Sequence, residues 1–313
     1  MLQNMLIAAE QVAILYIIAL VGVICDKLGW FTEPTAKKCT DLLFYVVTSA
    51  KILESFYTLE YSAEHLKGLF IAIGAGLIFH FVAALITAPL FNKQESDKAV
   101  VYKYACIYGN CGYMGLPLVD AVVGDEGVFY CSAFVIAFQI VTFTHGVWLI
   151  NKGKSENKAK FNPKALILNP GVIPVIIGLP LFLFKVNLPK IVSSPISSLA
   201  SMLSPLAMLI FGAYLSHTDF RSIRKNLGIF LVALIKLVVL PIIMLVSLKI
   251  IGLSGPLTIT LVIAAATPPA NNTTMFAAKY DRDASLGSQI VAIVSLISII
   301  TLPVIIALAD YYV

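Results

Sequence analysis

The sequence predicts an all-α membrane protein with about ten transmembrane helices. Of its 313 residues, 59% are hydrophobic and only 12% are charged, whereas a soluble domain carries about 25% charged residues. The mean hydropathy is +0.92. The apolar residues gather in runs of roughly 20, the length that a helix needs to cross a bilayer. These three observations indicate a chain whose solvent is lipid and exclude an ordinary soluble domain.

The expected spans follow one another with short polar connections. The first run has no Lys or Arg before it and lacks a small-residue cleavage site after it, so we expect it to remain as a helix. No connection is long enough for a soluble domain. In chain order, the spans are Met5–Cys25, Leu42–Tyr57, Leu66–Phe91, Val101–Val122, Gly127–Ile150, Lys164–Phe184, Ile191–Ser216, Asn226–Ile251, Leu257–Ala278 and Gly287–Ala309.

The basic residues give these spans an orientation. Most of the 22 lysines and arginines lie in the odd-numbered connections, and the even-numbered ones hold only Lys67, Lys185, Lys190 and Lys249. Cationic residues are retained on the cytoplasmic side. We therefore expect a cytoplasmic-membrane protein with both termini outside and a cytoplasmic linker at 151–163. Basic residues that flank spans do not indicate nucleic-acid binding.

The two halves of the chain are related by a shift of 156 residues. This shift lays Ala8–Leu28 on Lys164–Phe184 and the polar turn Asp125–Gly127 on Asp281–Asp283. Because each half holds five helices, an odd number, the second half must enter the membrane from the opposite face. The sequence thus predicts a 5+5 inverted repeat, although a tandem of unrelated helices could imitate one. The expected parts are 1–150, the linker 151–163, and 164–313.

Two spans contain helix-breaking stretches at matching places in the repeat. Residues 109–117 read GNCGYMGLP, and residues 266–274 read ATPPANNTT, so glycines and prolines interrupt both apolar runs. Irregular backbone inside a membrane survives only where protein buries it or a watery cavity lies beside it. Paired interruptions are the best sequence sign of a transporter's substrate site. The alternative is that Pro and Gly merely kink two packed helices.

The chemistry of the two breaks favours an anion. Half-helix N-termini carry partial positive charge, and side-chain amides donate hydrogen bonds without a buried full charge. A carboxylate fits such a site better than a cation does. Asn110, Asn271, Asn272 and Thr273 can donate such hydrogen bonds. The other residues of the two breaks that we expect at the substrate site are Cys111, Gly112, Tyr113 and Thr267.

Ionisable residues within spans are costly and are therefore functional candidates. Lys51 and Glu54 lie three apart on one helix face, where they can form a structural pair. Alternatively, Lys51 attracts the substrate and Glu54 couples to a proton. Asp120 lies one turn past Pro117 and is either structural or, with Lys51 and Glu54, part of a coupling or charge pair. Isolated polar residues are expected to be satisfied packing or snorkelling side chains. These are His80, His145, Gln139 and Lys236.

The residues do not indicate an enzyme, a metal site or a cofactor. The five cysteines have no CxxC spacing and no His neighbours, so they are interpreted as small packing residues. No nucleophile and base stand at motif spacing.

The two breaks, followed by Tyr280 and Asp281, resemble those of the auxin efflux carrier family, which includes plant PIN-type carriers and bacterial malate and malonate permeases. The resemblance implies a fold similar to bile-acid-type and sodium/proton-type transporters, with two crossing broken helices. Helices 1, 2, 6 and 7 would form a scaffold, and helices 3–5 and 8–10 a transport domain that moves like an elevator. It also implies a homodimer through the scaffold. By the same resemblance, the crossing prolines and the asparagines beside them would line the substrate site: Pro117, Pro268, Pro269, Asn110, Asn271 and Asn272.

Two features depart from the family pattern. Ser49 and the neighbouring Lys51 stand where the family often has a proline, although Pro205 retains it in the other half. The short linker 151–163 replaces the long loop of the plant carriers, so regulation through that loop is not implied.

The function expected from these patterns is secondary transport of a small organic anion such as malate or malonate. A sodium/proton-type antiporter on the same fold is the alternative, and it would need carboxylates at the crossing. A receptor that binds without translocating is a third possibility. The sequence leaves the coupling ion, a proton or sodium, open.

Overall fold

The computed structural model describes residues 2–152, 171–217 and 226–312. Within these ranges, the only β-type pairing is an isolated antiparallel bridge between Gly109 and Pro269. The prediction of an all-helical chain is therefore confirmed. Residues 153–163 of the expected linker and the start of the sixth expected span, up to residue 170, lie outside the described residues.

The helices of the first half follow the expected spans. The second span begins earlier than expected, because a polar helix precedes its apolar part and continues into it through a π-helical turn. In order, the elements are α1 (Leu2–Lys27), α2 (Glu33–Leu42), η1 (Leu43–Val47), α3 (Thr48–Thr58), α4 (Ala63–Thr87), α5 (Ser96–Ile107), η2 (Cys111–Gly115), α6 (Leu116–Val123), α7 (Asp125–Val141), η3 (Thr142–Gly146) and α8 (Val147–Asn151).

The second half has a similar order of helices and interruptions. Its seventh span is bent between two helices, and its eighth contains a π-helical turn. The elements are α10 (Ile173–Leu183), α11 (Lys190–Ala200), α12 (Leu203–Ser216), α13 (Leu227–Leu234), η5 (Ile235–Val239), α14 (Leu240–Ile250), α15 (Pro256–Ala266), α16 (Asn272–Lys279) and α17 (Ala284–Tyr312). The inverted relation between the two halves stays a prediction.

Several of these helices are suited to a bilayer by length and composition. Among the described residues, five stretches qualify as membrane spans, and shorter apolar helices accompany them. The five are Ala63–Thr87, Asp125–Asn151, Lys190–Ser216, Leu227–Ile250 and Ala284–Tyr312. The chain is thus a multi-pass membrane protein.

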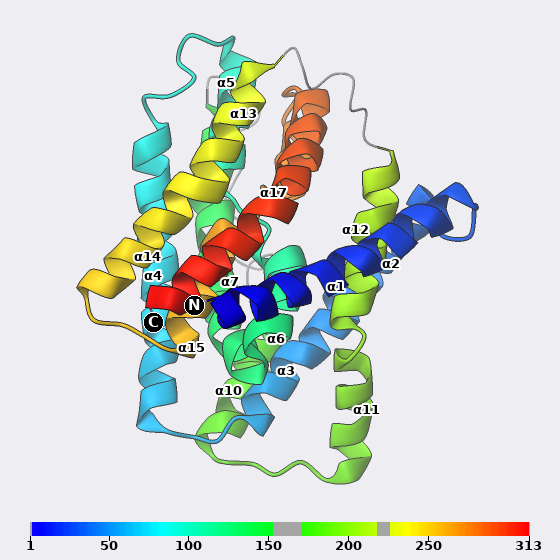
Figure 1. The fold of residues 1–313 in the computed structure, drawn as a ribbon, viewed down its shortest axis with the longest axis vertical. Helices are drawn as coiled ribbons and strands as arrows, with labels where there is room; N and C mark the ends of the chain where they lie inside the picture. Colours follow the sequence, from blue (N-terminus) through cyan, green and yellow to red (C-terminus); the bar gives the residue numbers. More distant parts are fainter. Residues whose placement is uncertain (1, 153–170, 218–225, 313) are drawn as a thin grey trace.

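The helices pack in two groups, which we call group A and group B. In group A, α1 and α2 lie against α12, and α3 lies against α10 and α11. In group B, α15 contacts α4, α6, α7, α14 and α17, and α5 contacts α13 and α17. The groups meet where α1 touches α6 and α17, and where α3 touches α7 (Figure 1).

Glycines allow the closest approach within group A. A Cβ atom at Gly212 of α12 would lie 1.9 Å from the carbonyl oxygen of Ala19 in α1, and one at Gly22 would lie 2.4 Å from that of Leu209. Small residues let membrane helices pack backbone to backbone. The α1–α12 contact therefore depends on both glycines.

Three described connections lie at one or the other end of the molecule. Figure 1 shows the α4–α5 connection at the top of the view and the α3–α4 and α10–α11 connections at the bottom. The α4–α5 connection thus lies at the opposite end from the other two, as spans that cross a bilayer in alternating directions require.

Candidate functional site

The two segments expected to be interrupted are interrupted, and their breaks meet. Helix α5 ends at Ile107 and α15 ends at Ala266, and each is followed by extended chain before the next helical turn. The amide of Asn110 donates to the carbonyl of Pro268 at 2.7 Å, and the amide of Ala270 donates to the carbonyl of Tyr108 at 2.9 Å. Each break thus satisfies backbone groups that the other leaves without a helical partner.

The first half-helix has its N-terminus at this crossing. Asn110 is the N-cap of η2, and its Oδ1 accepts a hydrogen bond from the amide of Tyr113 at 3.2 Å. Within the described residues, its Nδ2 has no partner. A Cβ atom on Gly112 would meet no other atom within 4 Å, so open space adjoins this first turn. Amides of a first helical turn attract negative charge.

The second half-helix, α16, begins with a polar sequence. Asn271 is its N-cap residue, but its side chain makes no capping hydrogen bond. Asn271 and Asn272 are half-buried, whereas Thr273 is buried. Within the described part of the chain, the Thr273 hydroxyl has no hydrogen-bond partner.

The remaining expected site residues lie around the same crossing with different exposure. Tyr113 is half-buried, and its ring stacks on Phe44 of η1 with centroids 4.8 Å apart. Thr267 is fully buried, and its hydroxyl donates to the carbonyl of Ala264 at 2.8 Å, so it is less free to bind a ligand. The other residues, Cys111, Pro117, Pro268 and Pro269, are buried.

Lys236 is a residue of this region that the sequence interpretation missed. It was expected to snorkel or to be satisfied by packing, but its side chain is 0% exposed, and its Nζ has no hydrogen-bond partner among the described residues. A Cβ atom on Gly109 would lie 2.6 Å from this Nζ, which places the ammonium directly against the crossing. Its nearest ring is Phe79, whose centroid is 5.0 Å away. The sequence signal was only a lone lysine in an apolar helix.

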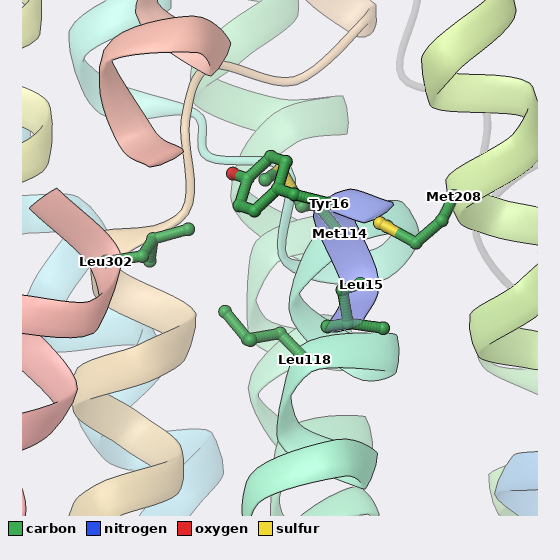
Figure 2. Close-up of a pocket in the computed structure, with 6 residues that line it drawn as sticks. All are labelled: Leu15, Tyr16, Met114, Leu118, Met208 and Leu302. Carbon is green, nitrogen blue, oxygen red and sulfur yellow. The ribbon is translucent and has the colours of Figure 1, made fainter. Parts of the chain in front are cut away.

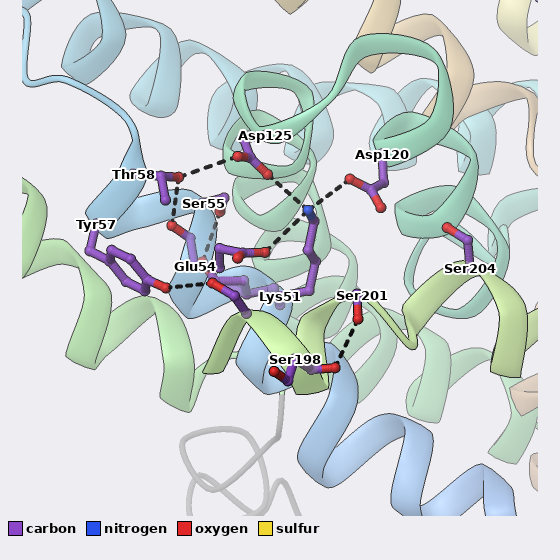
Figure 3. Close-up of polar contacts among 12 residues, drawn as sticks. Lys51, Glu54, Ser55, Tyr57, Thr58, Asp120, Asp125, Ser198, Ser201 and Ser204 are labelled. Carbon is purple, nitrogen blue, oxygen red and sulfur yellow. Dashed lines mark hydrogen bonds and ion pairs between the residues drawn. The ribbon is translucent and has the colours of Figure 1, made fainter. Parts of the chain in front are cut away.

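Lys51 belongs to a separate cluster between α3 and the α6–α7 corner (Figure 3). Its Nζ lies 3.3 Å from Glu54, 2.9 Å from Asp120 and 2.8 Å from Asp125. The expected Lys51–Glu54 pair is present. The two aspartates join it from group B, so the ion pairs link the two groups of helices. Nearby, Ser204 of α12 donates to the carbonyl of Pro117 at 3.3 Å.

Two other polar residues of the spans are satisfied by packing, as expected. The buried His80 ring places Nδ1 2.6 Å from the carbonyl of Gly76, and His145 Nδ1 lies 2.8 Å from the Tyr108 hydroxyl. The five cysteines are all free. Among the described residues, no group of three His, Cys, Asp or Glu side chains could hold a metal ion.

An apolar pocket adjoins the first half-helix. It lies between η2–α6 and helices α1, α12 and α17, so it separates group A from group B beside the crossing (Figure 2). Its lining includes none of the polar residues expected to bind substrate. The lining residues are Leu15, Tyr16, Met114, Leu118, Met208 and Leu302.

Comparison with known proteins adds one finding. The sequence model of a family described as membrane transport protein matches residues 7–306 of the chain. No curated protein matches the chain.

Proposed function

The chain belongs to the auxin efflux carrier family of membrane transport proteins, and on this premise we propose that it is a secondary transporter of a small organic anion. The substrate class we infer is a carboxylate or dicarboxylate such as malate or malonate. Transport families are not generally enzymatic, and the polar residues of the site fit binding rather than covalent chemistry.

The observation that carries this proposal is the crossing of the two breaks. Asn110 and Asn271 lie at the N-termini of two half-helices. The extended segments before these half-helices, Tyr108–Asn110 and Pro268–Ala270, are joined by backbone hydrogen bonds. Two half-helix N-termini there together contribute about one unit of partial positive charge. Amide donors at the same place can bind carboxylate oxygens, and the open space beside Gly112 leaves room for them.

The grouping of helices supports alternating access by an elevator motion. Group A contains the helices proposed as the scaffold, and group B contains those proposed as the transport domain. Where α1 and α12 meet η2, α6 and α17, the pocket between the groups is lined by apolar side chains, which can move past one another without loss of many hydrogen bonds. We propose that two copies associate through group A.

We further propose that the protein lies in the cytoplasmic membrane with both termini outside. The end that carries the odd-numbered, lysine-rich connections would then face the cytoplasm. In this orientation, the Lys51 cluster would lie on the outer side of the crossing. Flux under an imposed proton or sodium gradient tests whether either ion is coupled to transport.

The antiporter alternative receives less support from the site. A cation at the crossing would need carboxylates. Among the described residues, the buried charged side chain against the crossing is that of Lys236, a cation. The Asp120 carboxylate is paired with Lys51. The Asp120→Asn variant should lose cation exchange if the antiporter alternative is right, and should keep organic-anion binding if the carrier proposal is right.

The test is flux in liposomes. Purified protein is reconstituted with unlabelled malonate or malate inside, and uptake of the labelled acid is measured by counterflow. We expect uptake above protein-free liposomes, which a receptor that only binds cannot support. The proposal fails if none of these acids moves under proton, sodium or substrate gradients while the protein remains folded.

A further inference from the structure

Lys236 is a buried cation beside the crossing, and no carboxylate of the described residues pairs with it. It lies in the π-helical turn η5, its side chain is 0% exposed, and no ion pair among the described residues involves it. Phe79 and His80 of α4 face it, and Cys106 and Cys111 approach from the first broken helix. None of these neighbours is a carboxylate.

A charge in this position is costly unless something compensates it. The desolvation of a buried ammonium costs several kcal/mol in real proteins, and a partner charge with good geometry is needed to offset it. The Phe79 ring, whose centroid lies 5.0 Å from Nζ, contributes a cation–π contact, which offsets only part of this desolvation penalty. The ends of α5 and α15 add only partial negative charges, and no carbonyl accepts a hydrogen bond from Nζ.

The geometry points to Lys236 as the side chain that binds a carboxylate of the transported anion at the crossing. We propose this specificity role as a deepening of the carrier function, and it rests on that function. An anion that enters beside the two half-helix N-termini meets the ammonium behind Gly109. The lysine then selects small carboxylates over neutral and cationic solutes.

Gly109 is the feature that brings the ammonium so close. An added Cβ would lie 2.6 Å from Nζ and 2.7 Å from the Thr267 hydroxyl. Both are the ends of side chains, so Gly109→Ala is tolerated if the lysine moves away. This substitution therefore displaces the charge without removing it, whereas Lys236→Met removes the charge and retains much of the apolar stem.

The chain offers a matched control on the same membrane span. Lys249 lies near the end of α14, with Nζ 4.0 Å from the ring centroid of Tyr312 and far along the helix from the crossing. Lys249→Met makes the same chemical change as Lys236→Met. A general effect of losing one positive charge would appear in both variants.

The experiment measures malonate binding by thermal shift in detergent and malonate counterflow in liposomes. We expect Lys236→Met to lose the malonate-induced shift and to reduce counterflow at least tenfold, while its unliganded melting temperature does not fall. Gly109→Ala should weaken binding in the same direction, Lys236→Arg should retain part of it, and Lys249→Met should match the unmodified protein.

The outcomes separate this inference from the function on which it rests. Wild-type affinity and flux in Lys236→Met overturn the lysine's role and leave the carrier proposal standing. A lower melting temperature with unchanged malonate affinity also overturns the lysine's role in binding. In that case Lys236 only compensates the partial negative charges at the C-terminal ends of α5 and α15. If Lys236→Met does not fold, the Gly109→Ala variant decides: malonate affinity equal to that of the unmodified protein overturns the role of Lys236 in binding. Failure of the unmodified protein to bind or move any acid overturns the carrier function and this inference with it.

Discussion

Asn110 has two roles at the crossing that different substitutions can separate. Its Oδ1 caps η2 through the amide of Tyr113, and its Nδ2 is available to a ligand. Asn110→Ala removes both groups and should lower stability by about 1 kcal/mol in addition to reducing malonate transport. Asn110→Asp retains a capping oxygen but replaces the donor with a negative charge. We expect Asp to preserve the melting temperature and to reduce malonate counterflow at least tenfold.

A control for this prediction lies outside the site. Asn92 also has an Oδ1 that accepts a hydrogen bond, from Lys103 at 2.7 Å, but it lies in the exposed α4–α5 connection. Asn92→Asp adds the same charge there and should leave transport unchanged. Wild-type counterflow in Asn110→Asp would show that the Nδ2 group does not bind the anion.

At the scale of single residues, local contacts could be predicted and distant ones could not. The Lys51–Glu54 pair follows from a spacing of three on a helix. The bonds of Lys51 to Asp120 and Asp125 require the fold, because these partners are brought together only by tertiary packing. For Lys236, one sequence cannot distinguish a side chain that reaches the membrane surface from one enclosed on all sides.

At the scale of helices, the α1–α12 contact makes a strong steric prediction. Gly212→Ala would place a Cβ 1.9 Å from a backbone oxygen of α1, and backbone cannot move away as a side-chain end can. Overpacking typically costs about 1–3 kcal/mol and sometimes more. We expect a marked fall in the melting temperature in detergent and less folded protein.

Gly74 of α4 provides the comparison. A Cβ there meets no other atom within 4 Å, and alanine is a better helix former than glycine by about 1 kcal/mol. Gly74→Ala should therefore leave the melting temperature unchanged or raise it. Equal stability of the two variants would mean that α1 and α12 are not packed as closely as the structure has them.

The helix breaks were predictable, and the π-helical turns were not. Pro268 and Pro269 lack backbone donors, and Gly109 lowers helix propensity, so interruption follows from composition. That the breaks would meet followed from their matching positions in the repeat. The turn η5 leaves no comparable signal, since Ile235–Val239 is an ordinary apolar run apart from its lysine. A π-helical turn changes which residues face inward, and such turns are frequent at functional sites.

At the scale of the molecule, the proposed elevator motion requires group B to move against group A. The Lys51 cluster is one of the contacts that must then break, because it joins α3 to the α6–α7 corner. The Lys51 side chain is 11% accessible, and its partners range from 13% accessible for Glu54 to 43% for Asp125. Glu54 is on α3 with Lys51, so only the two aspartate pairs must break, and a pair as exposed as that with Asp125 contributes only about 0–1 kcal/mol. Such contacts can hold one state and still be broken in each transport cycle.

A reversible cross-link between the groups tests this motion. Cysteines replace Lys51 and Asp125 in a background in which Cys25 and Cys39 are serine, and a short bifunctional thiol reagent joins them. Transport by the same protein is compared before cross-linking, after it and after reduction. We expect cross-linking to stop malonate counterflow and reduction to restore it, because the bridge prevents α3 and α7 from separating.

The control cross-link joins two helices of group A. Thr40 of α2 and Tyr214 of α12 have their hydroxyl oxygens 3.3 Å apart, so cysteines there accept the same reagent. Since both helices belong to the proposed scaffold, this bridge should leave counterflow intact. Full transport with Lys51 and Asp125 positions bridged would mean that α3 and α7 move as one body, and the division into scaffold and transport domain would have to be redrawn. Loss of transport in both cross-linked proteins would instead indicate that motion within group A is part of the cycle.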